Sequence, residues 1–322
     1  MNKISGIKSV DFKIEAVGHG VVNWNGSMSV VGDDGKEINN HTFPKLRGYT
    51  NLNGKVKETG YKYKKEASDI DFKETPLYIS QNCIKNALFK SNSFLLQEGC
   101  IPQMDDLLAS IVGLVRGYVV THDKSGSKRK SPLLITDFVD QLGNGNFENM
   151  SRHGSKAKEV DKKNNTFFTK TTFGDTKYIG WASLNIEDLQ FISLSKQFER
   201  PAMEITSETQ GIALGKKIEE YLKSIDASKN PTVTFHKNYV RIGSIHNGGE
   251  QGLLLNDDAI DILVNEVIDM FKNLNIVQGK GYMSVANVVV DYNNGTPLRL
   301  KRNTSEANGE KSTNYAQYYI GK

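Results

Sequence analysis

The stretch Ser9-Val10-Asp11-Phe12-Lys13-Ile14-Glu15-Ala16 alternates apolar and polar side chains, with the apolar ones at the even positions. Side chains of a β-strand point alternately to its two faces, so this pattern predicts a strand with one buried face and one solvent-facing one. Residues 18–26, Gly-His-Gly-Val-Val-Asn-Trp-Asn-Gly, follow it. Their glycines permit a close backbone approach, and we expect the extended chain to continue into them.

Helical periodicity is clearest at residues 257–274, where apolar side chains recur at spacings of three and four. Asn256 or Asp257 would cap this helix, and the acidic residues of its first turn suit the helix dipole. Similar but shorter patterns predict three more helices, over residues 80–89 with Ser80 as the N-cap, 105–116 and 212–225.

Further alternation predicts strands at residues 182–192 and 283–292, and a glycine-bearing turn at 278–282 joins the last helix to the second of these strands. Because strands and helices mix without regular alternation, the sequence favours an α+β fold over a doubly wound parallel sheet. The order of elements fits a ferredoxin-like βαββαβ sheet, and we expect a single domain over residues 1–322.

Two polar, lysine-rich excursions interrupt this domain, at about residues 27–75 and about 121–180. The first contains Asp33-Asp34-Gly35, which is a hairpin-turn signal. The second contains residues 165–174, which are rich in strand-forming side chains. Structureless loops of this length are unusual, so we expect both excursions to hold local structure or to order on a partner.

The composition excludes several classes of protein. The chain of 322 residues has two cysteines, too few for a disulfide scaffold, and a net charge of +4. No apolar run approaches the roughly 18 residues of a membrane span, and the start of the chain lacks the apolar core of a signal peptide. We therefore expect a cytoplasmic protein with no membrane partner.

The basic residues are mostly lysine, since only 8 of the 41 are arginine. Lysine is a point charge suited to phosphate, whereas arginine is the usual reader of guanine edges. A nucleic-acid partner would therefore be held by its backbone and not read by its sequence.

The sequence offers no complete catalytic or metal-binding pattern. Its six histidines form no zinc motif, and His122-Asp123 stands without the other ligands of a metal phosphohydrolase. There is no Gly-x-Ser-x-Gly elbow and no Walker A sequence, and Gly18-x-Gly20 lacks the third glycine of a dinucleotide fingerprint. We expect no enzymatic activity, no metal and no cofactor.

Groups suited to phosphates and bases are more frequent. Residues 279–282, Gly-Lys-Gly-Tyr, offer backbone amides, an ammonium group and an aromatic ring in one turn. Residues 45–51 combine two cations with an aromatic ring and an amide, and polar residues at 80–85 open a helix whose N–H donors face outward. A solvated surface is the alternative for each, but their recurrence favours single-stranded nucleic acid.

Seven longer motifs carry a specific resemblance: VDFKI at 10–14, GHGVVNWNG at 18–26, PKLRGYTN at 44–51, TPLYISQN at 75–82, DFVDQLGNGNF at 137–147, KTTFGD at 170–175 and KGYM at 280–283. In this order they resemble the backbone subunit of a CRISPR surveillance complex (Cascade) of the minimal type I-F variant, which lacks a large subunit. The resemblance covers nearly the full length of the chain.

The resemblance implies an RNA-recognition-motif-like (RRM-like) palm with long insertions. It implies that several copies polymerise head to tail along the spacer of a CRISPR RNA, while other Cascade subunits cap the two ends of the guide. In such filaments a hairpin "thumb" displaces guide bases at regular intervals, and the remaining bases pair with target DNA. Cleavage of that DNA belongs to a separate helicase-nuclease.

On this reading the residues expected to contact RNA are Asn23, Trp24, Asn25, Lys45, Arg47, Ser80, Gln81, Asn82, Lys85, Lys170, Thr172, Phe173, Arg241, Lys280 and Tyr282. We expect the thumb within residues 51–75, where lysines and tyrosines interleave, with 166–180 as the alternative segment. A different function also remains open: an RNA-processing endoribonuclease of the same superfamily, with His19 as its general base.

Overall fold

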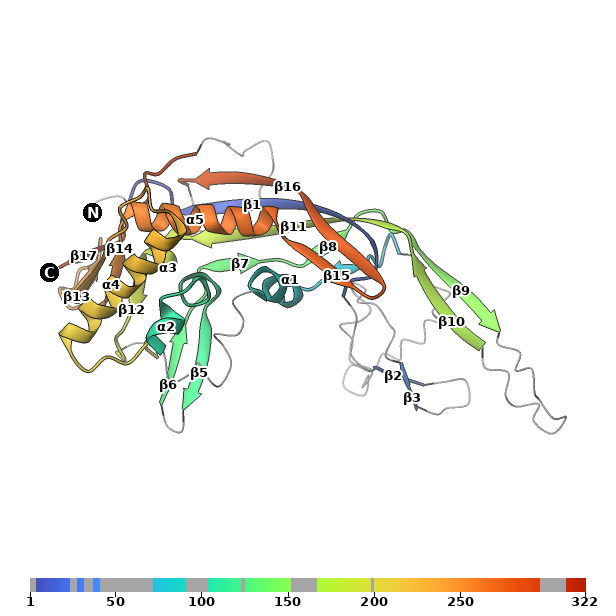
Figure 1. Cartoon of the computed structure of the whole chain (residues 1–322), viewed down its shortest axis with the longest axis horizontal. Coiled ribbons are helices and arrows are strands. Elements are labelled where there is room, and N and C mark those ends of the chain that lie inside the picture. Colours follow the sequence, from blue (N-terminus) through green and yellow to red (C-terminus); the bar gives the residue numbers. More distant parts are fainter. Residues whose placement is uncertain are drawn as a thin grey trace.

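The computed structural model describes most of the chain: residues 4–23, 28–31, 37–40, 72–90, 104–122, 125–151, 167–197, 200–295 and 311–322. Its long axis joins two ends of different character (Figure 1). Both termini and a small sheet lie at one end, and a projecting hairpin lies at the other. A large sheet and its helices occupy the space between them.

The large sheet has seven strands in the order β15-β16-β1-β11-β8-β4, and β7 pairs with β11 off this path. All of its pairings are antiparallel. The strands are β1 Ser9–Gly20, β4 Tyr78–Ile79, β7 Leu133–Ile135, β8 Phe138–Asp140, β11 Asp175–Asn185, β15 Asn275–Gln278 and β16 Gly281–Asn293. The predicted α+β class is therefore confirmed.

Strand β1 lies at the centre of the sheet, between β11 and β16, and pairs with both along nearly its whole length. Its even-numbered apolar side chains are buried as the alternation predicts, with at most 1% of Val10, Phe12, Ile14 and Ala16 exposed. A bulge between Glu15 and Ala16 shifts the register with β16. The strand continues to Gly20, which confirms as far as that residue the extended chain expected into residues 18–26.

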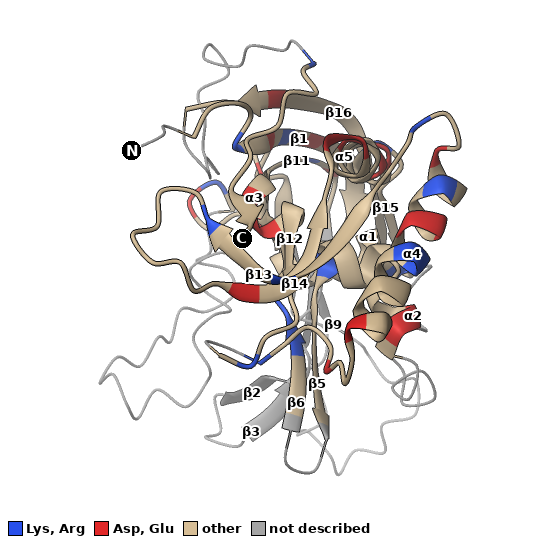
Figure 2. Ribbon diagram, turned by 90° about the vertical axis from the view of Figure 1, so that its left-hand side faces the viewer, with Lys and Arg blue, Asp and Glu red and all other residues tan. Residues whose placement is uncertain are grey.

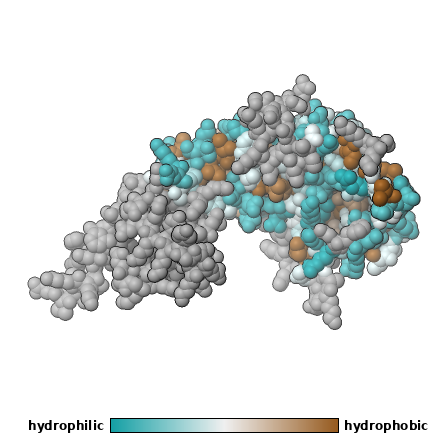
Figure 3. Space-filling view, turned by 180° about the vertical axis from the view of Figure 1, so that it is seen from behind, coloured by the Kyte–Doolittle hydropathy of each residue, from teal (hydrophilic) through white to brown (hydrophobic). Residues whose placement is uncertain are grey.

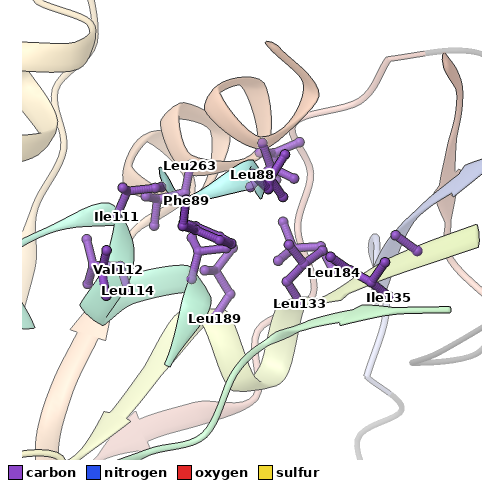
Figure 4. Packing of buried hydrophobic residues seen from close by; sticks show 14 of the residues in the cluster. Leu88, Phe89, Ile111, Val112, Leu114, Leu133, Ile135, Leu184, Leu189 and Leu263 are labelled. Atoms are coloured by element: carbon purple, nitrogen blue, oxygen red, sulfur yellow. The ribbon is translucent and has the colours of Figure 1, made fainter. Parts of the chain in front are cut away.

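Helix α5, Asp257–Lys272, packs along the buried face of this sheet (Figure 1). The rings of Phe12 and Phe271 lie 5.2 Å apart between their centroids. Asn256 is the N-cap, because its side chain accepts a hydrogen bond from the amide of Ala259. The core continues from α5 to other elements, and Figure 4 shows their apolar side chains meeting below the helix.

Helix α1, Gln81–Leu88, is capped by Ser80 as predicted, and it buries Ile84 and Leu88. Helix α4 also confirms its prediction, but at Glu208–Ile225 it begins four residues earlier because Ser207 caps it. α4 covers a second, four-stranded sheet of order β12-β14-β13-β17. Its strands are β12 Phe191–Ser193, β13 Val233–Arg241, β14 Glu250–Leu255 and β17 Tyr319–Gly321.

Three further hairpins stand apart from the two sheets: β2 Met28–Val31 with β3 Glu37–Asn40, β5 Tyr118–His122 with β6 Ser125–Arg129, and β9 Gly145–Ser151 with β10 Phe167–Phe173. β2 and β3 flank the turn signal at residues 33–35, and β10 confirms the strand predicted from 165–174. The hairpin β9–β10 projects furthest from the body (Figure 1).

The helix predicted over 105–116 is divided in two. Helix α2 covers only Met104–Leu108, and a π-helical turn η4 follows at Val112–Arg116. Between them the hydroxyl of Ser110 donates to the carbonyl of Leu107 and accepts from the amide of Gly113. A side chain on Gly113 would collide with the Leu107 carbonyl, at 2.2 Å, so this glycine permits the chain to fold back.

The strand predicted at 182–192 is also wrong, because the short helix α3, Ile186–Gln190, interrupts it. Asn185 starts this helix by accepting from the amide of Asp188. The turn at 278–282 is different too: it closes the hairpin of β15 and β16, and does not join a helix to a strand. The first error comes from a polar side chain that caps a helix within an apolar pattern, and the second from the short strand β15, which lies between α5 and the turn.

The second excursion, about 121–180, lies only partly outside the large sheet. β7, β8 and the first half of β11 fall within it, and Leu133, Ile135 and Phe138 are core residues. The remaining parts are the tip of β5–β6 and the hairpin β9–β10. Figure 3 shows the rear face of the described residues as mainly hydrophilic, with apolar side chains in small, separate groups.

Candidate nucleic-acid interface

Three segments of the chain converge where β1 ends. The amide of Gly20 donates to the carbonyl of Gly174, at 3.0 Å, and the amide of Val21 donates to that of Lys280, at 3.2 Å. Gly20 has a φ of +72°, and a side chain there would lie 2.2 Å from the Lys280 carbonyl. The Gly18-x-Gly20 motif thus holds the turn around Lys280 against the end of β1.

A row of accessible side chains crosses this end of the sheet. The register places Val277 of β15, Tyr282 of β16, His19 of β1 and Asp175 of β11 side by side. Tyr282 is 54% exposed and Val277 74%. Nδ1 of His19 lies 3.0 Å from Oδ1 of Asp175. Tyr282 and His19 therefore offer two exposed rings on which a base can stack.

Asn23 contacts the start of helix α1. Two groups of predicted RNA-binding residues, 23–25 and 80–85, are thus brought together at this point. Oδ1 of Asn23 accepts from the amide of Ser80 at 3.0 Å. Oδ1 of Asp137 accepts from the amide of Gln81 at 2.9 Å. The amides of Ser80 and Gln81, and that of Cys83, which donates to the Ser80 hydroxyl, are thus already bonded inside the protein. The side chains of Gln81 and Asn82 are exposed here.

Lys85 lies further along α1 and points into the body. Its Nζ donates to the hydroxyl of Ser131 at 2.8 Å, and the side chain is half-buried. Burial, together with the smaller effect of the nearby charge of Arg116, lowers the pKa of Lys85 to about 8. The same kind of burial lowers the pKa of Arg116. Two cations therefore share a partly dehydrated seam.

Phe173 lies at the base of the projecting hairpin. Its ring packs edge-on against Phe72, with centroids 5.1 Å apart. A side chain on Gly145 would overlap the Phe72 ring, at 2.4 Å, so β9 passes directly over it. The buried carboxylate of Asp140 fixes the preceding turn by accepting from the amides of Gly143 and Lys177, each at 2.9 Å. The hairpin thus grows from a rigid base.

Arg241 is the predicted residue that the structure sets apart from the others. Its guanidinium pairs with Glu187, with Nε to Oε1 at 2.6 Å and Nη2 to Oε2 at 3.1 Å, and it lies over the Tyr318 ring. Glu187 follows Asn185, which pairs with Ser9 at the opposite end of β1. Twelve residues of strand separate the two ends by roughly 36 Å. Arg241 therefore stabilises the small sheet.

The remaining candidates are not placed by the structure. Trp24, Asn25, Lys45 and Arg47 lie outside the described residues, as do most of residues 51–75. Lys170 and Thr172 lie in β10, opposite Glu148 and Asn146 of β9, but only their backbone is described. Their role in binding RNA stays a prediction.

Sequence reasoning missed Arg116 and Asp137. Arg116 stood at the end of a helical pattern, where a basic residue only suggests an interaction with the helix dipole. Asp137 contacts a residue 56 positions away, and no local pattern could have shown this. Across the described part of the chain, no group of three or more His, Cys, Asp or Glu could hold a metal ion. No helix there is long and apolar enough to cross a membrane.

Comparison with known families supplies the context for this surface. The model of a family described as "Type I-Fv CRISPR-associated protein Cas7fv-like" matches residues 6–322. Because the match covers nearly the whole chain, the chain belongs to the Cas7fv-like family of type I-Fv CRISPR-associated proteins. No curated protein matches the chain. The resemblance seen in the seven sequence motifs is thereby confirmed.

The lowered pKa of Lys85 gives a test of this geometry. Between the folded value of about 8 and the ordinary value of 10.5, the unfolded chain binds more protons at this residue than the folded one. The charged ammonium therefore destabilises the fold below pH 8, and this penalty disappears as the pH rises toward 10.5. We expect Lys85→Met to gain stability relative to wild type at pH 7, and the gain to shrink by pH 9.5.

Urea unfolding of both proteins at several pH values measures this difference. Lys223→Met, which changes an exposed lysine of α4, is the matched control for the loss of one charge. If the difference in the free energy of unfolding between Lys85→Met and wild type stays constant from pH 7 to pH 9.5, Lys85 is not buried in this way.

Proposed function

We propose that this chain is a non-catalytic backbone subunit of a cytoplasmic CRISPR effector complex, which grips the spacer of a CRISPR RNA without regard to its sequence. The observation that carries the proposal is the family match over residues 6–322. The described surface supports it: the rings of His19 and Tyr282 and the side chain of Lys280 are exposed at the end of β1, and Asn23, three residues further on, contacts the residue that caps α1. Such a surface suits stacking and phosphate contact more than the reading of base edges.

The large sheet serves as an RRM-like palm in this proposal. In chain order, β1, α1, β8, β11, α5 and β16 follow a βαββαβ sequence. In the sheet the corresponding strands stand in the order β16-β1-β11-β8, with the first and third strands at the centre, as in a ferredoxin-like sheet. Helix α4 and three strands of the small sheet, β12, β13 and β14, are then an insertion between β11 and α5, and β17 completes that sheet from the end of the chain.

The proposal also names the partners of this subunit. Copies of the chain stack head to tail along the guide, which requires a heterologous interface that does not close on itself. The length of the guide and the subunits that cap its two ends then limit the filament. Guide bases that remain splayed pair with target DNA. None of this requires the subunit to distinguish one spacer from another.

A second function deserves a test because of His19. Its imidazole is accessible and lies 3.0 Å from the carboxylate of Asp175, an arrangement that can orient a general base. Tyr282 stands opposite His19 in the register. The alternative is thus an endoribonuclease that cleaves CRISPR RNA precursors at this point of the sheet.

One RNA-binding experiment separates the two functions. Purified protein is incubated, without metal, with labelled repeat RNA and with guides that carry two unrelated spacers. We expect protection without cleavage, equal affinity for both spacers, and an equal loss of affinity for both in Lys280→Ala, because phosphate contacts carry no base information. Cleavage that His19→Ala abolishes would establish the endoribonuclease, and a mutant that discriminates between spacers would contradict the backbone grip.

The position of the thumb forms a separate prediction. The segment first expected, 51–75, lies mostly outside the described residues, so its role stays a prediction. The alternative segment, 166–180, includes β10, whose hairpin projects from a rigid base beside the candidate surface (Figure 1). We therefore expect the hairpin β9–β10 to reach the neighbouring copy.

Two deletions distinguish these segments. The first joins the paired residues Asn149 and Thr169 through an Asn-Gly turn, and the second replaces residues 53–71 by a Gly/Ser linker. We expect the first variant to fold, because its cut lies beyond the core, but to form no regular filament on guide RNA by electron microscopy. Normal filaments from the first variant and none from the second would move the thumb to 51–75.

A further inference from the structure

The seam between α1, η4 and β7 brings two cations and a hydroxyl together. Nζ of Lys85 donates to Oγ of Ser131 at 2.8 Å. The same hydroxyl donates its proton to the carbonyls of Val115, at 3.0 Å, and Leu133, at 2.9 Å, so it holds the Lys85 ammonium in place. Val115 immediately precedes Arg116. The hydroxyl of Ser131 thus connects α1, η4 and β7, which are separate in sequence.

The backbone at Arg116 is fixed by the residue that follows it. Gly117 has a φ of +73°, and its amide donates to the carbonyl of Val112 at 2.9 Å. A side chain on Gly117 would lie 2.5 Å from the carbonyl of Arg129, so β6 packs directly against this turn. The backbone that carries the Arg116 side chain is therefore fixed before any ligand binds.

No acid neutralises these two cations within the described residues. Salt bridges elsewhere pair Lys217 with Asp105 and Lys130 with Asp188, whereas none includes Lys85 or Arg116. Both side chains are half-buried, and burial lowers the pKa of each. Two neighbouring cations that lose part of their hydration without an anion are unfavourable. A bound anion would remove that penalty.

We propose that the seam of Lys85, Arg116 and Ser131 is a binding site for a backbone phosphate of the RNA. The proposal rests on the function proposed above and extends the RNA path from the start of α1 along the helix to η4. The planar guanidinium of Arg116 can hold two phosphate oxygens at once, while Lys85 supplies a point charge. Strand β6, which packs against this turn, carries further basic residues (Figure 2), of which Arg129 is buried and donates to the carbonyls of Phe191 and Asp188.

The test uses the full chain and a labelled single-stranded RNA of guide length with two unrelated sequences. Affinity is measured by fluorescence anisotropy over a series of salt concentrations for wild type, Arg116→Gln, Arg116→Lys and Lys223→Gln. Lys223 is exposed on α4 and serves as the charge-matched control. Circular dichroism of each variant establishes that it is folded, and Arg116→Lys keeps a cation in the seam if the glutamine variant does not fold.

We expect Arg116→Gln to weaken binding about tenfold for both RNA sequences, as for the loss of one charge-assisted contact. The slope of log affinity against log salt should also fall by about 0.7, the value for one phosphate of a single strand. Arg116→Lys should restore most of the slope but not all of the affinity, because a lysine lacks the fork. Lys223→Gln should match wild type.

The outcomes separate this site from the function on which it rests. If wild type binds RNA in a salt-dependent way and Arg116→Gln has the same affinity and salt slope, the site is overturned and the proposed function is left intact. Absence of RNA binding by wild type would overturn both. A final arm replaces chloride by phosphate at equal ionic strength and measures the melting temperature of wild type and Arg116→Gln. If phosphate raises the melting temperature of wild type alone, and Arg116→Gln does not change RNA affinity, the seam binds a free anion and the proposal is overturned.

Discussion

The antiparallel pairing of β1 with both β11 and β16 is the constraint on which the rest of the structure depends. It holds one strand between two long partners, so its even side chains form a continuous apolar face beneath α5. The same register decides where the polar residues of all three strands end. His19, Tyr282 and Asp175 come together only because β1 pairs with β16 on one side and with β11 on the other. A slip of one residue would turn the apolar face of β1 to solvent and separate this row.

The two ends of the sheet are consequently specialised. At one end Arg241, Glu187 and Tyr318 form internal contacts that tie the small sheet to α3. At the other, the glycines of β1 admit the turn around Lys280, and Phe72 anchors a hairpin that leaves the body. Rigid elements thus support the accessible groups, which is what a surface that must present a flexible strand requires. The seam of Lys85, Ser131 and Arg116 lies toward the Arg241 end, because the carbonyl of Pro132, next to Ser131, accepts from the amide of Asn185.

The parts of the fold that follow from local patterns were predictable. The alternation at 9–16 and the spacing at 257–274 indicated β1 and α5, and Ser80 indicated the start of α1. Strands β7 and β8 have three residues each, too few for alternation to be seen. The site was predictable in residue types but not in contacts: Asn23 and Asp137 bond the amides of Ser80 and Gln81 across more than 50 positions. Such pairings arise from the tertiary fold. The tertiary fold also places Arg241 away from the other candidate RNA-binding residues at the end of β1.

We propose that copies of this chain bind side by side on one guide and hold its backbone without reading its sequence. Native mass spectrometry of complexes assembled on CRISPR RNAs with graded spacer lengths tests it most directly. We expect copy number to rise in steps, with one subunit added for each fixed increment of spacer, whatever the spacer sequence. A copy number that stays constant as the spacer grows would contradict the account and indicate a closed oligomer.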